Sequence, residues 1–189
     1  MELILASQSP RRRELLARLG LRFRVEAAGA DETMDAAKDP FDEVARLSRV
    51  KAGAVHAGPE DVVIAADTMV VLDGAALGKP KDPADAARTL RALSGRDHQV
   101  MTGLTVKRGD WVRSLTSVTR VWFRELSEGE IAAYIASGEP LDKAGSYGIQ
   151  GLAACFVERL DGDYYNVMGL PLCPLTGLLR QAGVEVLGQ

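Results

Sequence analysis

The hydrophobic residues of this chain occur in short uninterrupted runs that alternate with stretches of helical periodicity. The runs from Leu3 to Ala6 and from Val62 to Ala66 contain no polar residue, which is typical of strands buried on both faces. Asp67 ends the second run, and residues 68–72 continue as an extended segment. The pattern therefore predicts two central strands, with the carboxylate of Asp67 at the end of the strand from Val62 to Ala66 and outside the core.

Amphipathic stretches that begin with capping residues predict the helices. At three of these starts a proline follows the capping side chain, and a capping box opens a fourth. The signals are Ser9-Pro10, Asp39-Pro40, Asp82-Pro83, and Ser127 with Glu130. Glycines end the first three helices. A further helix is expected over residues 172–182.

The remaining strands follow from alternation and length. Residues 22–27 alternate, and residues 98–107 and 112–124 form two long runs joined by a short turn, which favours an antiparallel hairpin. Another strand is expected over residues 152–160. Because helices interleave with strands while one pair is antiparallel, the predicted class is α/β with a mixed sheet in two lobes. Ligands on such sheets bind at strand ends and in the crevice between lobes.

Composition narrows the classes of function. The 189 residues suit one domain. A net charge of −3 and an aromatic content of 5% argue against nucleic-acid binding, which needs a basic face and stacking platforms. Cys155 and Cys173 are expected to be reduced core thiols. No apolar run approaches the ~20 residues of a membrane span, and no signal peptide is recognisable, so we expect a cytoplasmic protein with no membrane partner.

The turn between the first strand and the first helix is a candidate phosphate site. A helix N-terminus presents free N–H groups and the positive end of a dipole. Arg11 adds a planar donor fork, and Ser7 and Ser9 add hydroxyls. The competing interpretation is a capped surface helix with solvated arginines, and Arg12 and Arg13 are assigned to that surface. Three lysines, which could extend the site or be solvated, are Lys51, Lys79 and Lys81.

Carboxylates elsewhere in the chain could support hydrolysis. Asp67 could bind a divalent cation or orient water, or it could be a turn residue. Glu32, in a polar loop, is a candidate second metal ligand, because Mg²⁺ is held by one or two carboxylates together with phosphate oxygens. His56 and His98 show no ligand spacing and are expected to be structural or solvated. No Ser-His-Asp arrangement is apparent, so metal-assisted hydrolysis is the chemistry these residues could support.

The glycine-rich segment 137–151 is too long for a simple connection, and such loops are usually functional. Gln150 carries both a donor and an acceptor, as recognition of a base edge requires. Tyr147 could stack on a ring or hydrogen-bond to it. The loop is therefore a candidate for contacting the non-phosphate part of a ligand.

Five segments of the sequence, taken in order, resemble the Maf family of nucleoside triphosphate pyrophosphatases. They are residues 5–12 (LASQSPRR), 65–68 (AADT), 77–80 (LGKP), 142–151 (DKAGSYGIQG) and 165–172 (YNVMGLPL). The resemblance implies that residues 1–189 form a single ITPase-like α/β domain, with two lobes and an active site in the central cleft. It also implies hydrolysis of a nucleoside triphosphate to the monophosphate and pyrophosphate with Mg²⁺ or Mn²⁺, often by a homodimer.

The resemblance also implies roles for individual residues. Asp67 matches the proposed catalytic acid of the family, and Glu32 matches the further acidic residue of the site. The remaining positions match substrate contacts. Those matching triphosphate contacts are Arg11, Lys51 and Lys79, with Ser7 nearby, and those matching positions tied to nucleotide choice are Arg11, Thr68 and Gln150.

The form of the segment 142–151 resembles the branch of the family that acts on dTTP and UTP. These nucleotides, and modified pyrimidine nucleotides, are therefore the expected substrates. Two alternatives remain open at this point. One is the branch that acts on 7-methyl-GTP, and the other is a non-catalytic nucleotide-binding regulator of septum formation.

Overall fold

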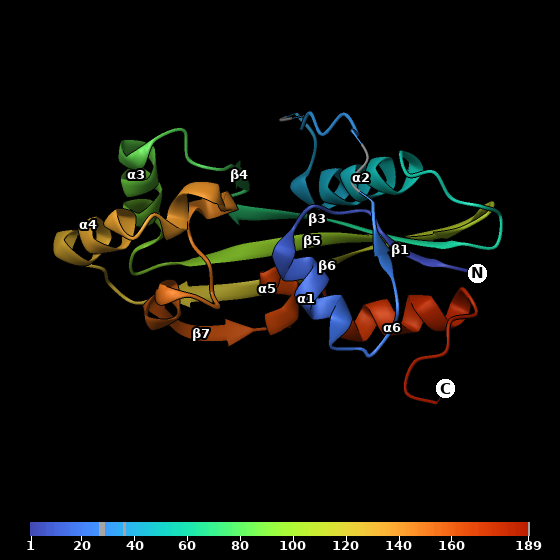
Figure 1. Ribbon diagram of the computed structural model, residues 1–189. Coiled ribbons are helices and arrows are strands. Elements are labelled where there is room, and N and C mark those ends of the chain that lie inside the picture. Colours follow the sequence, from blue (N-terminus) through green and yellow to red (C-terminus); the bar gives the residue numbers. More distant parts are fainter. Residues whose placement is uncertain (27–28, 36, 189) are drawn as a thin grey trace.

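The structure, a computed structural model, describes residues 1–26, 29–35 and 37–188 and contains one mixed sheet flanked by helices (Figure 1). The strands run in the order β2-β1-β3-β5-β6-β7, and β4 pairs with β3. The parallel pairs are β1 with β2 and with β3, and the other pairs are antiparallel. The predicted mixed α/β class is confirmed. The strands are β1 (Leu3–Leu5), β2 (Arg24–Val25), β3 (Val62–Leu72), β4 (Ala75–Leu77), β5 (Asp97–Arg108), β6 (Trp111–Phe123) and β7 (Val157–Asp161).

The helices begin where the capping signals place them. The side chains of Ser9, Asp39 and Asp82 each accept a backbone N–H bond, and Ser127 and Glu130 form the predicted capping box. The α-helices are α1 (Pro10–Ala17), α2 (Pro40–Gly53), α3 (Pro83–Leu93), α4 (Glu128–Ala136), α5 (Tyr164–Met168) and α6 (Leu172–Gln181). The short 3-10 helices in the described part of the chain are η1 (Glu139–Asp142), η2 (Ala144–Ser146) and η3 (Leu152–Phe156). Among the described residues, no helix is long and apolar enough to cross a membrane.

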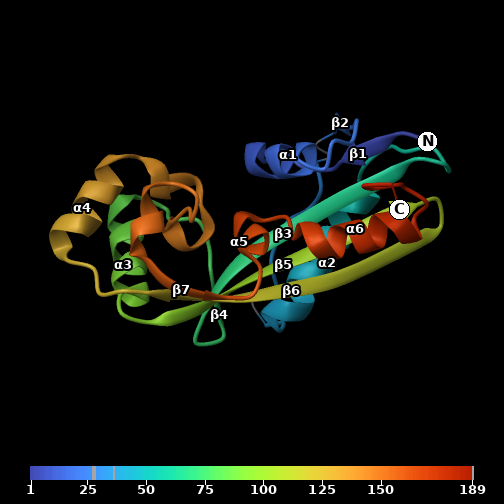
Figure 2. The same cartoon turned by 90° about the horizontal axis from the view of Figure 1, so that it is seen from below.

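Strands β1 and β3 are buried on both faces, as their apolar runs predicted. Leu3 and Leu5 belong to the large core that also contains residues of α1 and α6, whereas Ile4 and Ala6 pack with Ala52 of α2. Figures 1 and 2 show α2 on one face of the sheet and α1, α5 and α6 on the other. Helices α3 and α4 gather at one end of the molecule, where β7 and β4 also lie (Figures 1 and 2). The long strands β3, β5 and β6 therefore connect two groups of helices.

Several predicted details differ in the structure. The segment expected to be a strand over residues 152–160 begins as η3 and becomes β7 only at Val157. Ala153 and Phe156 are buried while the residues between them are exposed, so the apolar run follows a helical turn rather than a strand. The expected strand over residues 22–27 is reduced to Arg24–Val25, with its last position outside the described residues. Cys155 and Cys173 are free but exposed, so placing them in the core was wrong.

Candidate active site

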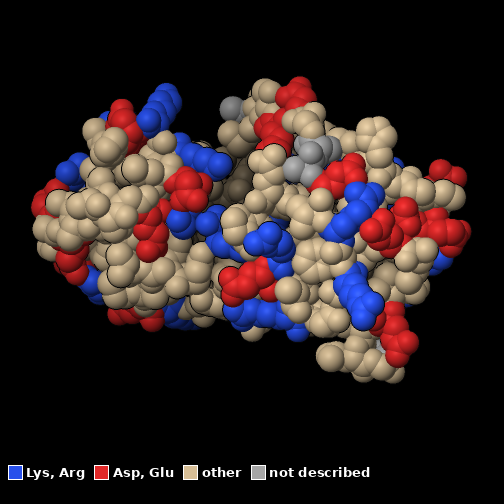
Figure 3. Space-filling view, in the orientation of Figure 1, with Lys and Arg blue, Asp and Glu red and all other residues tan. Residues whose placement is uncertain are grey.

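A cavity of about 580 Å³ lies between the two groups of helices. Figure 3 shows the molecule hollowed at this place, with Lys and Arg side chains around the opening. The walls come from the turn after β1, the loop before α2, α2 itself, β3, the loop after β4, the segment 142–150 and the end of α5. Ten residues proposed for the site from sequence all line it: Ser7, Ser9, Arg11, Glu32, Lys51, Asp67, Thr68, Lys79, Tyr147 and Gln150. Lys81 is exposed and is not among the lining residues.

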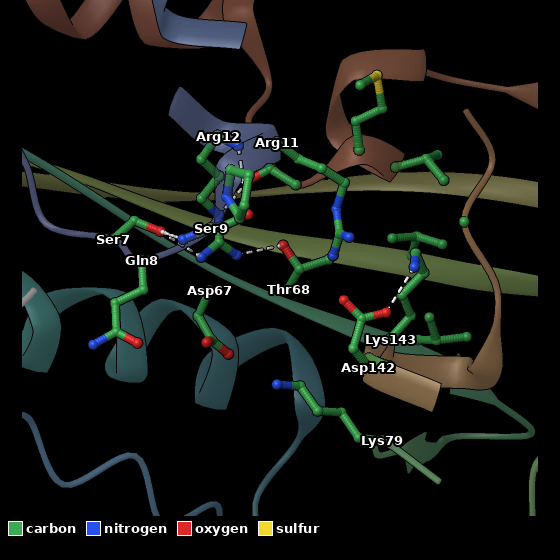
Figure 4. Close-up of a pocket in the computed structure, with 18 of the residues that line it drawn as sticks. Ser7, Gln8, Ser9, Arg11, Arg12, Asp67, Thr68, Lys79, Asp142 and Lys143 are labelled. Carbon is green, nitrogen blue, oxygen red and sulfur yellow. Dashed lines mark hydrogen bonds and ion pairs between the residues drawn. The ribbon is translucent and has the colours of Figure 1, made fainter. Parts of the chain in front are cut away.

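Arg12 lines the cavity, so its assignment to the solvated helix surface was wrong. Its side chain is directed into the cavity wall rather than along the helix surface (Figure 4). Nε donates to Gly169 O at 2.8 Å, Nη2 to Thr68 Oγ1 at 3.0 Å and Nη1 to Ser7 Oγ at 3.4 Å. Desolvation lowers the pKa of this guanidinium, and the charge of Asp67 opposes that shift. Arg13, by contrast, is exposed as predicted.

Arg12 and Arg13 have different surroundings, because consecutive side chains on an α-helix point about 100° apart. The sequence offered one signal for Arg12, namely a second arginine in the first turn of a helix that follows a buried strand. Nothing in the spacing shows which arginine meets the end of α5, which is 157 positions away along the chain. The contact that distinguishes Arg12 is therefore a long-range one.

Asp67, Lys51 and Glu32 form a chain of alternating charges in the cavity. Lys51 Nζ lies 2.6 Å from Asp67 Oδ1 and 3.1 Å from Glu32 Oε2. The Lys51 and Asp67 side chains are 12% and 15% exposed, whereas Glu32 is 57% exposed. Asp67 lies within β3 and not at its carboxyl end, so the expected strand end was wrong. The cavity lies over the middle of this strand, where Asp67, Thr68 and Val70 line it.

Helix α2 brings Lys51 to Asp67 by an unusually close approach to the sheet. Gly103 of β5 is paired with Asp67 across the β3–β5 ladder. A Cβ atom on Gly103 would lie 2.1 Å from Val44 O of α2. Deeper in the same interface, Ser48 Oγ and Thr105 Oγ1 are 2.6 Å apart. The missing side chain at position 103 thus allows the helix to sit where its lysine reaches the carboxylate.

Thr68 and Tyr147 are both engaged by other side chains at the cavity wall. Thr68 Oγ1 is within hydrogen-bonding distance of Arg12 and, at 3.0 Å, of Thr102 Oγ1. Tyr147 Oη lies 2.7 Å from His98 Nε2, and its ring meets Phe123 edge to face. Burial raises the pKa of Tyr147 and lowers that of His98 to about 4. The structure therefore places His98 inside the core, in a neutral form at pH 7.

Two further cationic side chains, those of Arg11 and Lys79, line the same cavity. Figure 4 shows Lys79 extending toward Asp67 from the side opposite the turn between β1 and α1. Arg11 lines the cavity beside Thr68, and Gln150 lines it from an exposed position on the segment 142–151. Asp67 and Glu32 provide hard oxygen donors, and no group of three or more His, Cys, Asp or Glu side chains gathers as a metal site in the part of the chain that the structure describes. The cavity can thus bind a polyanion next to a carboxylate.

A family model described as Maf-like protein matches residues 2–182. The chain belongs to the Maf family. A dTTP/UTP pyrophosphatase of Vibrio cholerae is 53% identical over 182 residues, which cover 95% of this chain and 97% of the relative. A dTTP/UTP pyrophosphatase of Moorella thermoacetica is 50% identical over 193 residues, covering 100% and 98% of the two chains. The Staphylococcus aureus Ham1 protein shares the fold of this Maf-like chain, with a TM-score of 0.53 at 16% identity over 96% and 99% of the two chains.

Proposed function

We propose that this Maf-like chain hydrolyses dTTP and UTP to the nucleoside monophosphate and pyrophosphate. The observation that carries the proposal is the position of Asp67 in a cavity to which Arg11, Lys51 and Lys79 also contribute. These cations can neutralise a triphosphate while the carboxylate stands beside it. The two relatives above, at 53% and 50% identity, carry this activity in their names.

The residues of the cavity suggest how the reaction proceeds. The triphosphate lies along the turn from Ser7 to Arg11, where N–H groups at the start of α1 face it. A water molecule attacks the α-phosphorus and gives a proton to Asp67, the bond to the bridging oxygen breaks, and pyrophosphate leaves. Positioning and charge stabilisation supply most of the rate in such reactions. Arg12 positions Ser7 and Thr68, two residues that line the cavity, through its hydrogen bonds to them.

Asp67 and Glu32 are the residues that would hold Mg²⁺ or Mn²⁺. The structure supports the fit, because both carboxylates already converge on a single cationic group, the ammonium of Lys51. Carboxylate oxygens and phosphate oxygens together are the donor set that Mg²⁺ prefers. When bound, the metal would neutralise charge on the phosphates and acidify water.

The nucleobase would lie against the segment 142–151. Gln150 can donate its amide N–H to O4 of uracil or thymine, which cytosine replaces with a donor. The Tyr147 hydroxyl is already bonded to His98, so we assign its ring, rather than its hydroxyl, to the base pocket. Thr68 contributes to nucleotide choice through Arg12, its hydrogen-bonding partner.

The assay that tests this proposal is pyrophosphate release from each canonical nucleoside triphosphate, 7-methyl-GTP and modified pyrimidine triphosphates, with Mg²⁺ or Mn²⁺. We expect dTTP and UTP to have the highest kcat/KM, with equimolar monophosphate and pyrophosphate as products. Preferential hydrolysis of 7-methyl-GTP, or release of inorganic phosphate in place of pyrophosphate, would contradict the proposal. Turnover that does not depend on added divalent cation would contradict the proposed cofactor.

Three further assignments belong to the same proposal. Residues 1–189 act as one domain of two lobes, which is supported by strands β3, β5 and β6 extending between the two groups of helices. A homodimer is supported by the family resemblance, and a cytoplasmic location remains the prediction made from the sequence. Sedimentation of the purified chain tests the homodimer, and fractionation of cells tests the cytoplasmic location.

A further inference from the structure

The segment from Gly148 to Leu152 is held from behind by two side chains outside the cavity. Tyr134, on α4, accepts the backbone N–H of Gly148 through its hydroxyl oxygen at 3.1 Å. Glu139, at the start of η1, accepts the backbone N–H of Leu152 through Oε2 at 3.0 Å. The two side chains are themselves joined, because Tyr134 Oη donates to Glu139 Oε1 at 2.9 Å. Both ends of the segment are therefore fixed to one hydrogen-bonded pair.

Two glycines of this segment, Gly148 and Gly151, pack closely against the side chains of Lys143 and Glu139. A Cβ atom on Gly151 would lie 2.2 Å from Glu139 Oε1. A Cβ atom on Gly148 would lie 2.8 Å from Cε of Lys143, whose Nζ donates to Glu139 O at 2.6 Å. Side chains at these two positions would displace the backbone from the groups that hold it. The segment can approach Tyr134 and Glu139 closely because it lacks side chains there.

Gln150 stands between these two fixed points and faces the cavity. Its neighbours Tyr147, Gly148 and Ile149 also line the cavity, and all three are buried. Gln150 itself is exposed, so packing of its own side chain does little to orient it. The direction of the Gln150 amide is then determined by the backbone on either side of it.

We propose that Tyr134 and Glu139 are positioning residues that set the preference of the enzyme for uracil and thymine through the backbone of the Gln150 segment. The inference rests on the proposed function, because it takes Gln150 as the group that meets the base. Neither residue lines the cavity, so neither touches the nucleotide. Their effect reaches the base through hydrogen bonds at Gly148 and Leu152.

The hydroxyl of Tyr134 can be removed without removing its ring. The ring is buried and packs edge to face against Phe156 at 5.1 Å between centroids. Tyr134→Phe keeps this packing and deletes the acceptor for Gly148 and the donor to Glu139. Glu139→Gln keeps the shape of the side chain but leaves it a single acceptor oxygen, whereas the Tyr134 hydroxyl and the Leu152 N–H each need one. Tyr164→Phe and Glu128→Gln are the matched controls, since Tyr164 is exposed on α5 and Glu128 pairs with Arg91 on the surface.

The experiment compares kcat/KM for UTP with that for CTP in each purified variant, and measures inhibition by tripolyphosphate. We expect the UTP/CTP ratio to fall about tenfold in Tyr134→Phe and in Glu139→Gln and to be unchanged in both controls. Inhibition by tripolyphosphate, which probes only the phosphate end of the cavity, should change less than about twofold. Amide hydrogen exchange at Gly148 and Leu152 should become faster in the variants, which reports the lost bonds directly.

A double-variant cycle with Gln150→Ala separates positioning from general damage. In the Gln150→Ala background, Tyr134→Phe should lower the UTP/CTP ratio little further. An unchanged ratio in both single variants, an equal fall in the Gln150→Ala background, or a parallel loss of tripolyphosphate inhibition would each overturn the inference. If Tyr134→Phe fails to fold, Glu139→Gln decides by the same criteria. A wild-type chain that releases pyrophosphate from UTP but fails these criteria overturns only this inference, whereas one inactive on both dTTP and UTP overturns the proposed function as well.

Discussion

The ammonium nitrogen of Lys51 lies 2.6 Å from Asp67 Oδ1 in the cavity, with less than a sixth of either side chain exposed. The two residues come from α2 and from the middle of β3. A charge that is withdrawn from water in this way needs its partner, because an isolated buried charge is costly. Through this pair, the position of α2 on the sheet is coupled to the Asp67 carboxylate, on which the proposed chemistry depends.

Replacing Asp67 with asparagine should abolish turnover while the fold persists. Asparagine keeps the size of the side chain but cannot take a proton from water or neutralise Lys51. We expect kcat for dTTP to fall by at least about 100-fold, measured by pyrophosphate release. Asp73→Asn is the control, since Asp73 pairs with Arg96 on the surface and asparagine tolerates its positive φ. Activity of Asp67→Asn within a few-fold of wild type would remove Asp67 from the catalytic role.

Arg12→Lys should impair the enzyme far more than Arg13→Lys. A lysine ammonium cannot reach Gly169, Thr68 and Ser7 at once, as the planar guanidinium does. We expect kcat/KM for dTTP to fall at least about tenfold in Arg12→Lys, and to stay near wild type in Arg13→Lys, because Arg13 is exposed. Equal effects of the two substitutions would show that the bonds of Arg12 do not matter to the reaction.

Gly103→Ala should lower both stability and activity. The new methyl group would lie 2.1 Å from Val44 O, so α2 would have to move away from the sheet and carry Lys51 with it. We expect the free energy of unfolding to fall by about 1–3 kcal/mol, with a loss of turnover larger than the unfolded fraction explains. Denaturant unfolding and pyrophosphate release measure the two effects. In Gly177→Ala, on α6, a methyl group would meet nothing within 4 Å, and this variant should be as stable as wild type or more so.

Stability should decrease as pH falls below neutrality because of His98. Burial lowers its folded-state pKa to about 4 from the ordinary value of 6.5, so between these values the unfolded chain binds the proton and the folded chain does not. The contribution is therefore fully present above pH 6.5 and declines toward pH 4, by roughly 3 kcal/mol in total. Denaturant unfolding of wild type and His98→Phe across this range should show a weaker pH dependence in the variant. The same slope in both proteins would assign the acid sensitivity to other groups.

Much of the fold was predictable because its signals are local. Ser9, Asp39 and Asp82 each cap a helix within the next three positions, and such bonds form between residues that are neighbours in any conformation. The apolar run that Asp67 follows likewise predicts a strand, whichever residues pack against it. The structure of residues 152–156 could not be predicted in this way, because an apolar run of that length fits a buried strand and a buried helical turn equally well.

Within the site, the sequence by itself determined which kinds of groups are present: hydroxyls and arginines after a buried strand, a carboxylate on β3, lysines, and a glycine-rich segment bearing Gln150. Only the tertiary structure decided their partners. It turned Arg12 toward Gly169 and Thr68, placed Lys51 between Asp67 and Glu32, and joined Tyr134 and Glu139 behind Gln150. The physical reason is that Arg12 meets Gly169, and Lys51 meets Asp67, only after the sheet has brought distant segments together. Neither the periodicity nor the local spacing of the sequence encodes that geometry.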